Sequence, residues 1–210
     1  KKEKEVKQPP AVVASCPFCS GNEDKTPPEI FVYPASRKPK DGPGWLVRVV
    51  PNKFNALGID ERNIKTQPLG LYYSMTGYGA HEVIIESPQH DIFFEDQPLE
   101  QMKAILHVFK ERMVDLYLDN KIKQVVIFKN SGQEAGASIA HPHSQLIATA
   151  ITPIYQKGEL QGAREYFKNK RSCIWCDMLI QELRMNIQIF DTAGNVVKED
   201  PPKIRLVFEN

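Results

Sequence analysis

The sequence predicts an α+β domain with a mainly antiparallel sheet and one long packed helix. Segments with strand character outnumber helical ones, and a single long amphipathic segment separates the earlier strands from the later ones. The regular alternation of strand and helix that is typical of parallel, doubly wound sheets does not occur in the sequence. Together these observations favour antiparallel strands packed against one helix.

The strand and loop segments follow from local composition. Residues 1–15 form a charged, proline-containing leader for which we expect no fixed structure. Residues 16–44 are rich in Pro, Gly, Asn and Lys, so loops are expected to dominate there. Strands are expected at residues 45–52, 81–88, 122–129 and 143–150.

The long helix is expected between residues 99 and 116, where apolar residues recur at spacings of three and four. These residues are Leu99, Met102, Leu106, Phe109, Met113 and Leu116. We expect this stripe to face the sheet. Residues 160–185 carry a further helical pattern, and residues 186–200 are typical of a hairpin about Ala193, Gly194 and Asn195.

Composition and charge argue against a nucleic-acid-binding protein and against a membrane protein. A net charge of +1 over 210 residues gives no electrostatic footprint for nucleic acid or for an acidic membrane surface. No apolar run is long enough to span a bilayer, and the chain does not open on a signal peptide, so a cytoplasmic location is expected. The chain opens without Met and stops just after a strand-like segment, so we expect it to be a fragment of a longer protein.

The stretch "HPHSQ" points to chemistry at a strand. If residues 141–147 are extended, His141, His143 and Gln145 share one face. The preceding "NSGQEAGAS", residues 130–138, is a small-residue loop whose backbone N–H groups can approach an anion closely. A neutral imidazole beside such a loop can attack phosphorus and form a covalent intermediate. His81 and His107 are expected at the surface or behind the site.

Two Cys-x-x-Cys pairs indicate metal or redox chemistry in a cytosolic chain. Cys16 and Cys19 have the spacing of a redox pair, but the Pro-rich residues that follow cannot form the helix such a pair needs. Half of a tetrahedral zinc site fits better, and the second pair, Cys173 and Cys176, is the default source of the other half, with the histidines as alternatives.

The segments "CPFCSGNEDKTPPEI", "VRVVPNKFNAL", "HEVIIESPQH" and "NSGQEAGASIAHPHSQ", which follow one another in this order along the chain, resemble the galactose-1-phosphate uridylyltransferase family of the histidine triad superfamily. The resemblance implies a histidine-triad-like fold that is the first unit of a tandem duplication. It also implies three parts: a flexible leader at 1–15, a first domain at 16–170 with zinc and nucleophile, and the start of a truncated second repeat at 171–210.

The resemblance also implies residue roles. His143 would be the nucleophile, with Gln145 hydrogen-bonded to phosphoryl oxygens. Structural zinc would be bound by Cys16, Cys19, His90 and His141, which replaces the four-cysteine assignment, while Cys173 and Cys176 would begin a second zinc site. Positions that match phosphate contacts are Asn130, Gly136 and Ser138, and those around base and ribose are Phe18, Val50, Asn52, Phe54 and Val83.

The implied activity belongs to galactose and wider carbohydrate metabolism. UMP would pass from UDP-glucose to His143 and then to galactose 1-phosphate by a ping-pong route, in a homodimer. Two departures, Ser144 for a common Gly and Lys53 for a common Asp, open an alternative, an ADP-sugar phosphorylase that uses the same histidine. A further alternative is a non-catalytic, zinc-stabilised nucleotide-binding domain.

Overall fold

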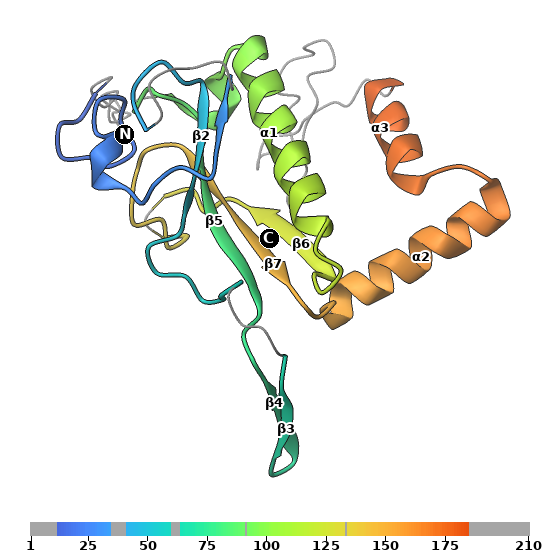
Figure 1. Ribbon diagram of the computed structural model, residues 1–210. Helices are drawn as coiled ribbons and strands as arrows, with labels where there is room; N and C mark the ends of the chain where they lie inside the picture. Colours follow the sequence, from blue (N-terminus) through green and yellow to red (C-terminus); the bar gives the residue numbers. More distant parts are fainter. Residues whose placement is uncertain (1–11, 35–40, 60–63, 91, 133, 185–210) are drawn as a thin grey trace, which may run out of the picture. The chain divides into compact units, whose positions relative to one another are not determined.

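A computed structural model describes residues 12–34, 41–59, 64–90, 92–132 and 134–184 (Figure 1). The chain divides into two compact units, residues 1–152 and residues 153–210, and each is described by itself. The domain boundary expected at residue 170 was placed where the Cys-x-x-Cys motif repeats, and not by the compactness of the fold. That boundary stays a prediction.

The first unit contains a five-stranded antiparallel sheet, which confirms the predicted fold class. Its strands, in spatial order, are β1 (Phe31–Tyr33), β2 (Val47–Pro51), β5 (Gly79–Ile85), β7 (His143–Thr149) and β6 (Gln124–Phe128). Four of them lie where strands were expected. β5 and β7 are paired along their whole length, with Ile85 opposite His143 and Gly79 opposite Thr149.

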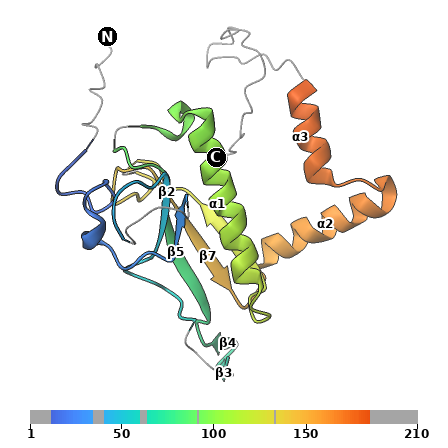
Figure 2. The same ribbon diagram turned by 45° about the horizontal axis from the view of Figure 1, so that its top comes forward.

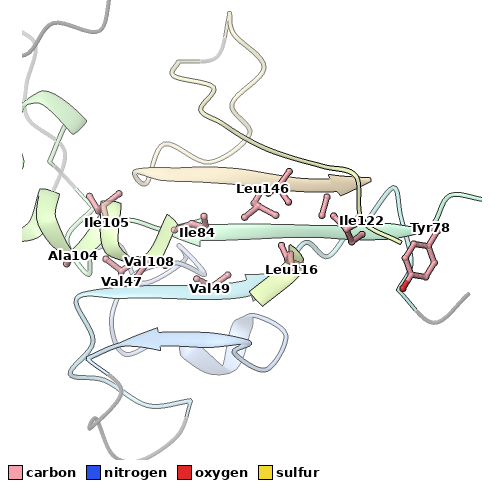
Figure 3. Close-up of a cluster of buried hydrophobic side chains, with 12 residues drawn as sticks. Val47, Val49, Tyr78, Ile84, Ala104, Ile105, Val108, Leu116, Ile122 and Leu146 are labelled. Carbon is pink, nitrogen blue, oxygen red and sulfur yellow. The ribbon is translucent and has the colours of Figure 1, made fainter. Parts of the chain in front are cut away.

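One helix, α1 (Leu99–Tyr117), covers one face of this sheet in both views (Figure 1, Figure 2). Figure 3 shows side chains from the helix and from the strands meeting in a single core. The core residues are Val47, Val49, Tyr78, Ile84, Ala104, Ile105, Val108, Leu116, Ile122, Val125, Leu146 and Ala148. Burial of this apolar surface is a main source of stability for the sheet.

The buried stripe of α1 differs from the expected one. Ile105 and Val108 are fully buried, whereas Leu99 and Leu106 are exposed by 69% and 59%. Met102, Phe109 and Met113 of the expected stripe nevertheless pack half-buried against the core, and Leu116 is buried in it. The stripe thus faces the sheet as expected, but its centre is shifted by about one residue. The reason is polar: Arg112, one turn after Val108, is drawn into the sheet by paired hydrogen bonds to Glu82, at 2.8 and 2.6 Å.

A second, two-stranded sheet was not anticipated. β3 (Thr66–Leu69) and β4 (Tyr72–Met75) form a hairpin whose turn contains Gly70 at φ +60°. Pro68 and exposed tyrosines mask the alternation that would have indicated strands. Short 3-10 turns lie at Glu23–Lys25 (η1) and Phe94–Asp96 (η2).

The second unit contains α2 (Ile154–Lys170) and α3 (Ile174–Arg184), where one helical pattern was expected. Arg171 ends α2 in the left-handed conformation, with φ 55°. Asp177 of α3 accepts hydrogen bonds from Tyr166 and Ser172, at 2.9 and 2.7 Å. The hairpin expected at 186–200 lies outside the described residues. Among the helices that the structure describes, none has the length and hydropathy to cross a bilayer.

Candidate functional site

Strands β5 and β7 present opposite chemistry on their two faces. Alternate residues such as Ile84 and Leu146 face α1, in the core. The residues between them face the other way, where Val83 and Ile85 join a second buried cluster with the first cysteine pair. His143 and Gln145 lie opposite Ile85 and Val83, so the register places both on this second face.

Four potential metal ligands meet at one end of this face. The ligand atoms of Cys16, Cys19, His90 and His141 lie within 4.8 Å of one another. The Sγ of Cys19 is 3.4 Å from Nδ1 of His90 and 3.6 Å from Nδ1 of His141. Such spacings are close to the edges of the tetrahedron that sulfur and nitrogen ligands form around zinc. The four residues expected to bind one ion are thus brought together.

The surroundings of the cluster fit a metal. Nε2 of His141 donates to the carbonyl oxygen of Ser87 at 2.7 Å, which leaves Nδ1 to face the cysteines. Burial lowers the pKa of His141 to about 4, so its imidazole is in the neutral, ligating form at pH 7. Burial, together with the neighbouring Cys19, raises the pKa of the Cys16 thiol, which is a cost that a bound cation would remove.

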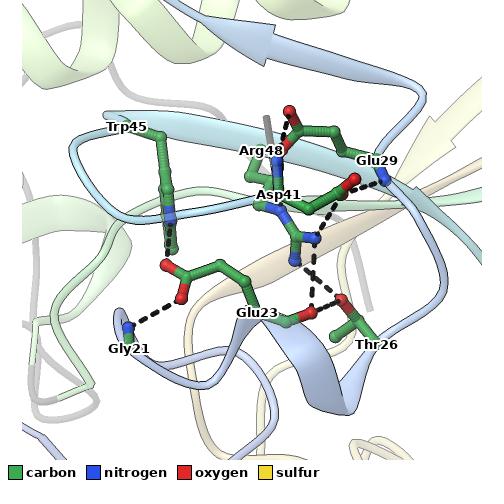
Figure 4. A network of polar contacts seen from close by, with 7 residues as sticks. All are labelled: Gly21, Glu23, Thr26, Glu29, Asp41, Trp45 and Arg48. Carbon is green, nitrogen blue, oxygen red and sulfur yellow. Dashed lines mark hydrogen bonds and ion pairs between the residues drawn. The ribbon is translucent and has the colours of Figure 1, made fainter. Parts of the chain in front are cut away.

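A buried polar network fixes the loop that carries the first cysteine pair (Figure 4). Arg48 of β2 is 1% exposed and donates to Thr26 at 2.7 Å and to Glu29 at 3.1 Å. Nearby, the indole Nε1 of Trp45 donates to Glu23 at 2.7 Å. These contacts tie the loop, including the 3-10 turn η1 within it, to the neighbouring strand.

The imidazole of His143 has the hydrogen bonding and the protonation state that a nucleophilic histidine requires. Its Nδ1 lies 2.7 Å from the carbonyl oxygen of His141 and donates to it, which leaves the Nε2 lone pair for attack. Burial lowers the pKa of His143, so the neutral imidazole prevails at pH 7. The ring of Phe18 stands edge-on at a centroid distance of 5.3 Å and limits the movement of the imidazole.

The strand that carries His143 lies within the expected 143–150, and it starts two residues after the beginning of the stretch 141–147 that was treated as extended. It begins at His143, because Pro142 has no N–H to donate to a neighbouring strand. The carbonyl of Pro142 nevertheless accepts from Glu86 at 3.1 Å, so His141 remains aligned with the sheet just ahead of β7.

Gln145 belongs to a polar group that the sequence did not reveal. Its Oε1 is 2.9 Å from Nε2 of His81 and 3.4 Å from Nδ2 of Asn52. His81, expected at the surface or behind the site, therefore contacts one of the predicted site residues directly.

The opposite face beneath His143 is also polar. Ser144 donates to the fully buried carboxylate of Glu86 at 2.5 Å, and Lys129 pairs with the same carboxylate at 2.5 Å. Lys129 also donates to the carbonyl oxygen of His143 at 3.2 Å. Ser144 thus points away from the nucleophile, toward the core.

The residues expected around a base and ribose lie in two settings. Phe18, Val50 and Val83 are buried in one apolar cluster beside the cysteine pair. Asn52 adjoins this cluster, and its Oδ1 accepts from the backbone N–H of Phe54 at 2.9 Å. The Phe54 side chain is 84% exposed and stands apart from that cluster.

The small-residue loop before β7 contains two glycines in the left-handed region, Gly132 and Gly136, with φ 82° and 83°. The N–H of Ala137 donates back to the carbonyl of Gly132 at 3.1 Å. Ser138 is exposed and Asn130 is half-buried. Glycine adopts a positive φ without strain and has no side chain, which is what a loop needs if its backbone is to approach an anion closely.

The second cysteine pair lies in the second unit. Cys173 immediately precedes α3 and Cys176 is in its first turn, and both are exposed. Hydrogen bonding by Cys176, from its backbone and from its side chain, lowers the pKa of Cys173. Within the described part of the chain, the cluster at Cys16 is the one group of three or more such ligands close enough to share an ion.

The functional neighbours that sequence reasoning missed all depend on sheet register. His81 and Glu86 are in "HEVIIESP", and their opposite faces follow from alternation once the strand is accepted. Their partners, however, come from β7 and from Lys129, and pairing between strands is not visible in one sequence.

Comparisons with known proteins were made for the sequence and for the fold. Residues 46–153 match the family model described as galactose-1-phosphate uridyl transferase, N-terminal domain. The chain is 35% identical over 209 residues to ADP-glucose phosphorylase from Arabidopsis thaliana, covering 99% of this chain and 57% of that relative. It is 28% identical over 131 residues to galactose-1-phosphate uridylyltransferase from Thermotoga maritima, covering 62% and 41%.

Solved structures show the same fold. An Arabidopsis thaliana ADP-glucose phosphorylase with bound ADP-glucose has a TM-score of 0.63 at 30% identity, over 87% of this chain and 54% of that one. A uridylyltransferase has a TM-score of 0.61 at 27% identity, over 85% and 52%. The chain therefore spans about half the length of these solved structures.

Proposed function

The chain belongs to the galactose-1-phosphate uridylyltransferase family, and from this premise we propose that it transfers a nucleoside monophosphate through His143. The observation that carries the proposal is the orientation of that imidazole. Its Nδ1–H is held by the carbonyl of His141, and its ring is neutral and edge-on to Phe18. Such a group can form and release a bond to phosphorus without a separate base.

The reaction would proceed in two displacements at one phosphorus. Nε2 of His143 attacks the α-phosphorus of a nucleotide sugar; a P–N bond forms and the P–O bond to the sugar phosphate breaks, releasing sugar 1-phosphate. An acceptor phosphate oxygen then attacks the same phosphorus, and the P–N electron pair returns to the imidazole. Gln145 and the loop with Asn130, Gly136 and Ser138 would donate hydrogen bonds to the phosphoryl oxygens.

We propose ADP-glucose as the donor and inorganic phosphate as the acceptor. The ADP-glucose phosphorylase from Arabidopsis thaliana supports this choice, because its similarity extends over 99% of the chain. The second candidate is UMP transfer from UDP-glucose to galactose 1-phosphate, as in relatives named uridylyltransferase, whose similarity covers 62% of the chain. In both, the apolar cluster at Phe18, Val50 and Val83, with Asn52 and Phe54, would receive the nucleoside.

Zinc is the metal proposed for the cluster of Cys16, Cys19, His90 and His141. All four coordination places would be filled by protein, so the ion would stabilise the fold and activate no water. His141 would then be fixed at the base of β7, two residues before the nucleophile. A second zinc at Cys173 and Cys176, and a homodimer, stay predictions.

The test is the intact mass of the chain after brief incubation with ADP-glucose and, separately, with UDP-glucose. We expect an AMP-sized increment that is absent in His143→Asn, and its loss on adding inorganic phosphate. His107→Asn is the matched control, since His107 is on α1 and contacts Tyr33 on the far face. A UMP-sized increment alone would establish the second candidate. No increment with either donor would favour a nucleotide-binding domain without catalysis.

A further inference from the structure

Three polar side chains from three strand segments meet on the second face of the sheet, the face that carries His143. Asn52 follows β2, His81 is in β5, and Gln145 is in β7. Nε2 of His81 lies 2.9 Å from Oε1 of Gln145 and 3.0 Å from Nδ2 of Asn52. His81 is opposite Ile147 and Gln145 is opposite Val83, so the two are diagonal neighbours on one face.

The orientation of the Asn52 amide is fixed from outside the group. Its Oδ1 accepts the backbone N–H of Phe54 at 2.9 Å, so its Nδ2 must face His81 and Gln145. Since Nδ2 is a donor, the Gln145 atom that faces it is the acceptor Oε1. The Nε2 amino group of Gln145 is then directed away from both, and no described residue accepts from it.

One proton position on His81 satisfies both contacts to Oε1 of Gln145, and it leaves Nε2 of His81 and Nδ2 of Asn52 as two donors, 3.0 Å apart, that share this acceptor. With the proton on Nε2, His81 and Asn52 both donate to Oε1 of Gln145, an oxygen with two lone pairs. With the proton on Nδ1, two lone pairs would face each other at 2.9 Å. The Nδ1 proton would also be a buried donor without an acceptor, because Nδ1 is buried and has no hydrogen-bond partner among the described residues. We assign the Nε2–H tautomer on these grounds.

We propose that His81 is a positioning residue that holds the Gln145 amide with its Nε2 amino group turned toward the phosphoryl group transferred by His143. The inference rests on the proposed function, in which Gln145 donates to phosphoryl oxygens. Without His81, the amide can rotate and present Oε1, an acceptor, to the negatively charged phosphoryl group. His81 touches neither the substrate nor the reacting atoms in this role.

Two substitutions separate the hydrogen bond from the shape of the ring. In His81→Gln the side-chain amide places a donor near the position of the histidine Nε2, whereas His81→Asn places one near Nδ1. We expect His81→Gln to form the adduct within about threefold of the wild-type rate and His81→Asn to be slower by about tenfold, the equivalent of one lost hydrogen bond. His81→Phe, which keeps a ring and removes both nitrogens, should match His81→Asn.

The measurement is the single-turnover rate of adduct formation at saturating ADP-glucose, with melting temperature and metal content as checks of the fold. A structural role would lower the melting temperature, whereas a positioning role slows the rate at saturation and leaves the melting temperature and metal content unchanged. His107→Phe is the matched control on the far face of the sheet, and its rate should equal that of the wild type.

A double-mutant cycle with Gln145→Ala completes the test. Loss of Gln145 alone should slow the adduct step by about 100-fold, as loss of one donor to a developing oxyanion does. Adding His81→Phe to Gln145→Ala should then cost nothing further. If His81→Phe slowed adduct formation equally in the wild type and in Gln145→Ala, or did not slow it in the wild type, the role proposed for His81 would be wrong while the proposed function would stand. Absence of any adduct on the wild-type chain with either nucleotide sugar would overturn the proposed function, and this inference with it.

Discussion

Two cysteine pairs of identical spacing have opposite surroundings in this chain. Cys16 and Cys19 are buried and meet two histidines that are 71 and 122 residues from Cys19 in the sequence. Cys173 and Cys176 are exposed at the start of α3, where Cys173 is hydrogen-bonded by a neighbour three residues away. The first pair depends on the whole antiparallel sheet, whereas the second depends on one helix end. The spacing Cys-x-x-Cys therefore makes metal binding possible, and the fold of the rest of the chain determines whether further ligands lie close enough to complete a site.

The largest expected difference between the pairs is in stability. Replacing Cys16 and Cys19 with Ser should abolish metal binding at the first site and lower the free energy of unfolding of the first unit by more than about 3 kcal/mol. The same double substitution at Cys173 and Cys176 should have a much smaller effect on the free energy of unfolding of the second unit, because both side chains are exposed. Metal content and urea denaturation measure both. If the two double variants lost similar amounts of unfolding free energy, the two cysteine pairs would not differ in their contribution to stability.

The supports of the first pair should be nearly as important as its ligands. Arg48→Met removes a buried guanidinium and leaves the Glu29 carboxylate, whose side chain is 5% exposed, without that partner. We expect a loss of about 3 kcal/mol in unfolding free energy, because a buried ion pair broken on one side is strongly destabilising.

The control for Arg48 is Lys103→Met, which breaks an ion pair whose side chains are 60% and 81% exposed. It should cost about 0.5 kcal/mol or less, as surface pairs do. A cost for Arg48→Met no greater than that of the control would show that the network in Figure 4 contributes no stability to the loop.

Thiol accessibility should differ by a smaller factor. Under native conditions we expect Cys173 and Cys176 to be alkylated at least about tenfold faster than Cys16 and Cys19, because thiolate character and exposure govern the reaction. The lowered pKa of Cys173 acts in the same direction, since it increases the thiolate fraction at neutral pH. Mass spectrometry of peptides over time measures the order. Faster reaction at the first pair would contradict the buried geometry.

The smallest expected effect is at the support of the second pair. Tyr166→Phe removes the half-buried hydrogen bond to Asp177, next to Cys176. The melting temperature of the chain should shift by less than about 2 °C, because a single hydrogen bond contributes little net stability. A shift as large as that of Arg48→Met would mean that the second pair is as firmly held as the first.

Much of the sheet could be predicted from local pattern. The strands with dense β-branched residues and the long helix were found, and the small-residue loop before His143 was recognised as a unit. The centre of the α1 stripe was misplaced by about one residue, because Arg112 is buried by Glu82, a residue on another element. The β3–β4 hairpin was missed because Pro68 and exposed side chains obscure its alternation.

The candidate site could be predicted only in part. His141 and His143 stand out in the sequence by their spacing, but His90 as a fourth ligand followed from the resemblance. The contacts of His81 with Gln145 and of Glu86 with Lys129 join segments by register. Register arises from packing of complete strands, and no short window of sequence contains it.

Successive side chains of strand β7 alternate between the face of the candidate site and the face of the core. His143 and Gln145 face the site, while Ser144, Leu146 and Ala148 are buried on the side of the core. Inserting or deleting one residue within the strand would exchange these faces, turning the imidazole toward the core and a leucine toward the candidate site. Length variation among functional descendants of this chain is thus confined to the loops on either side of β7, or to changes of two residues at a time.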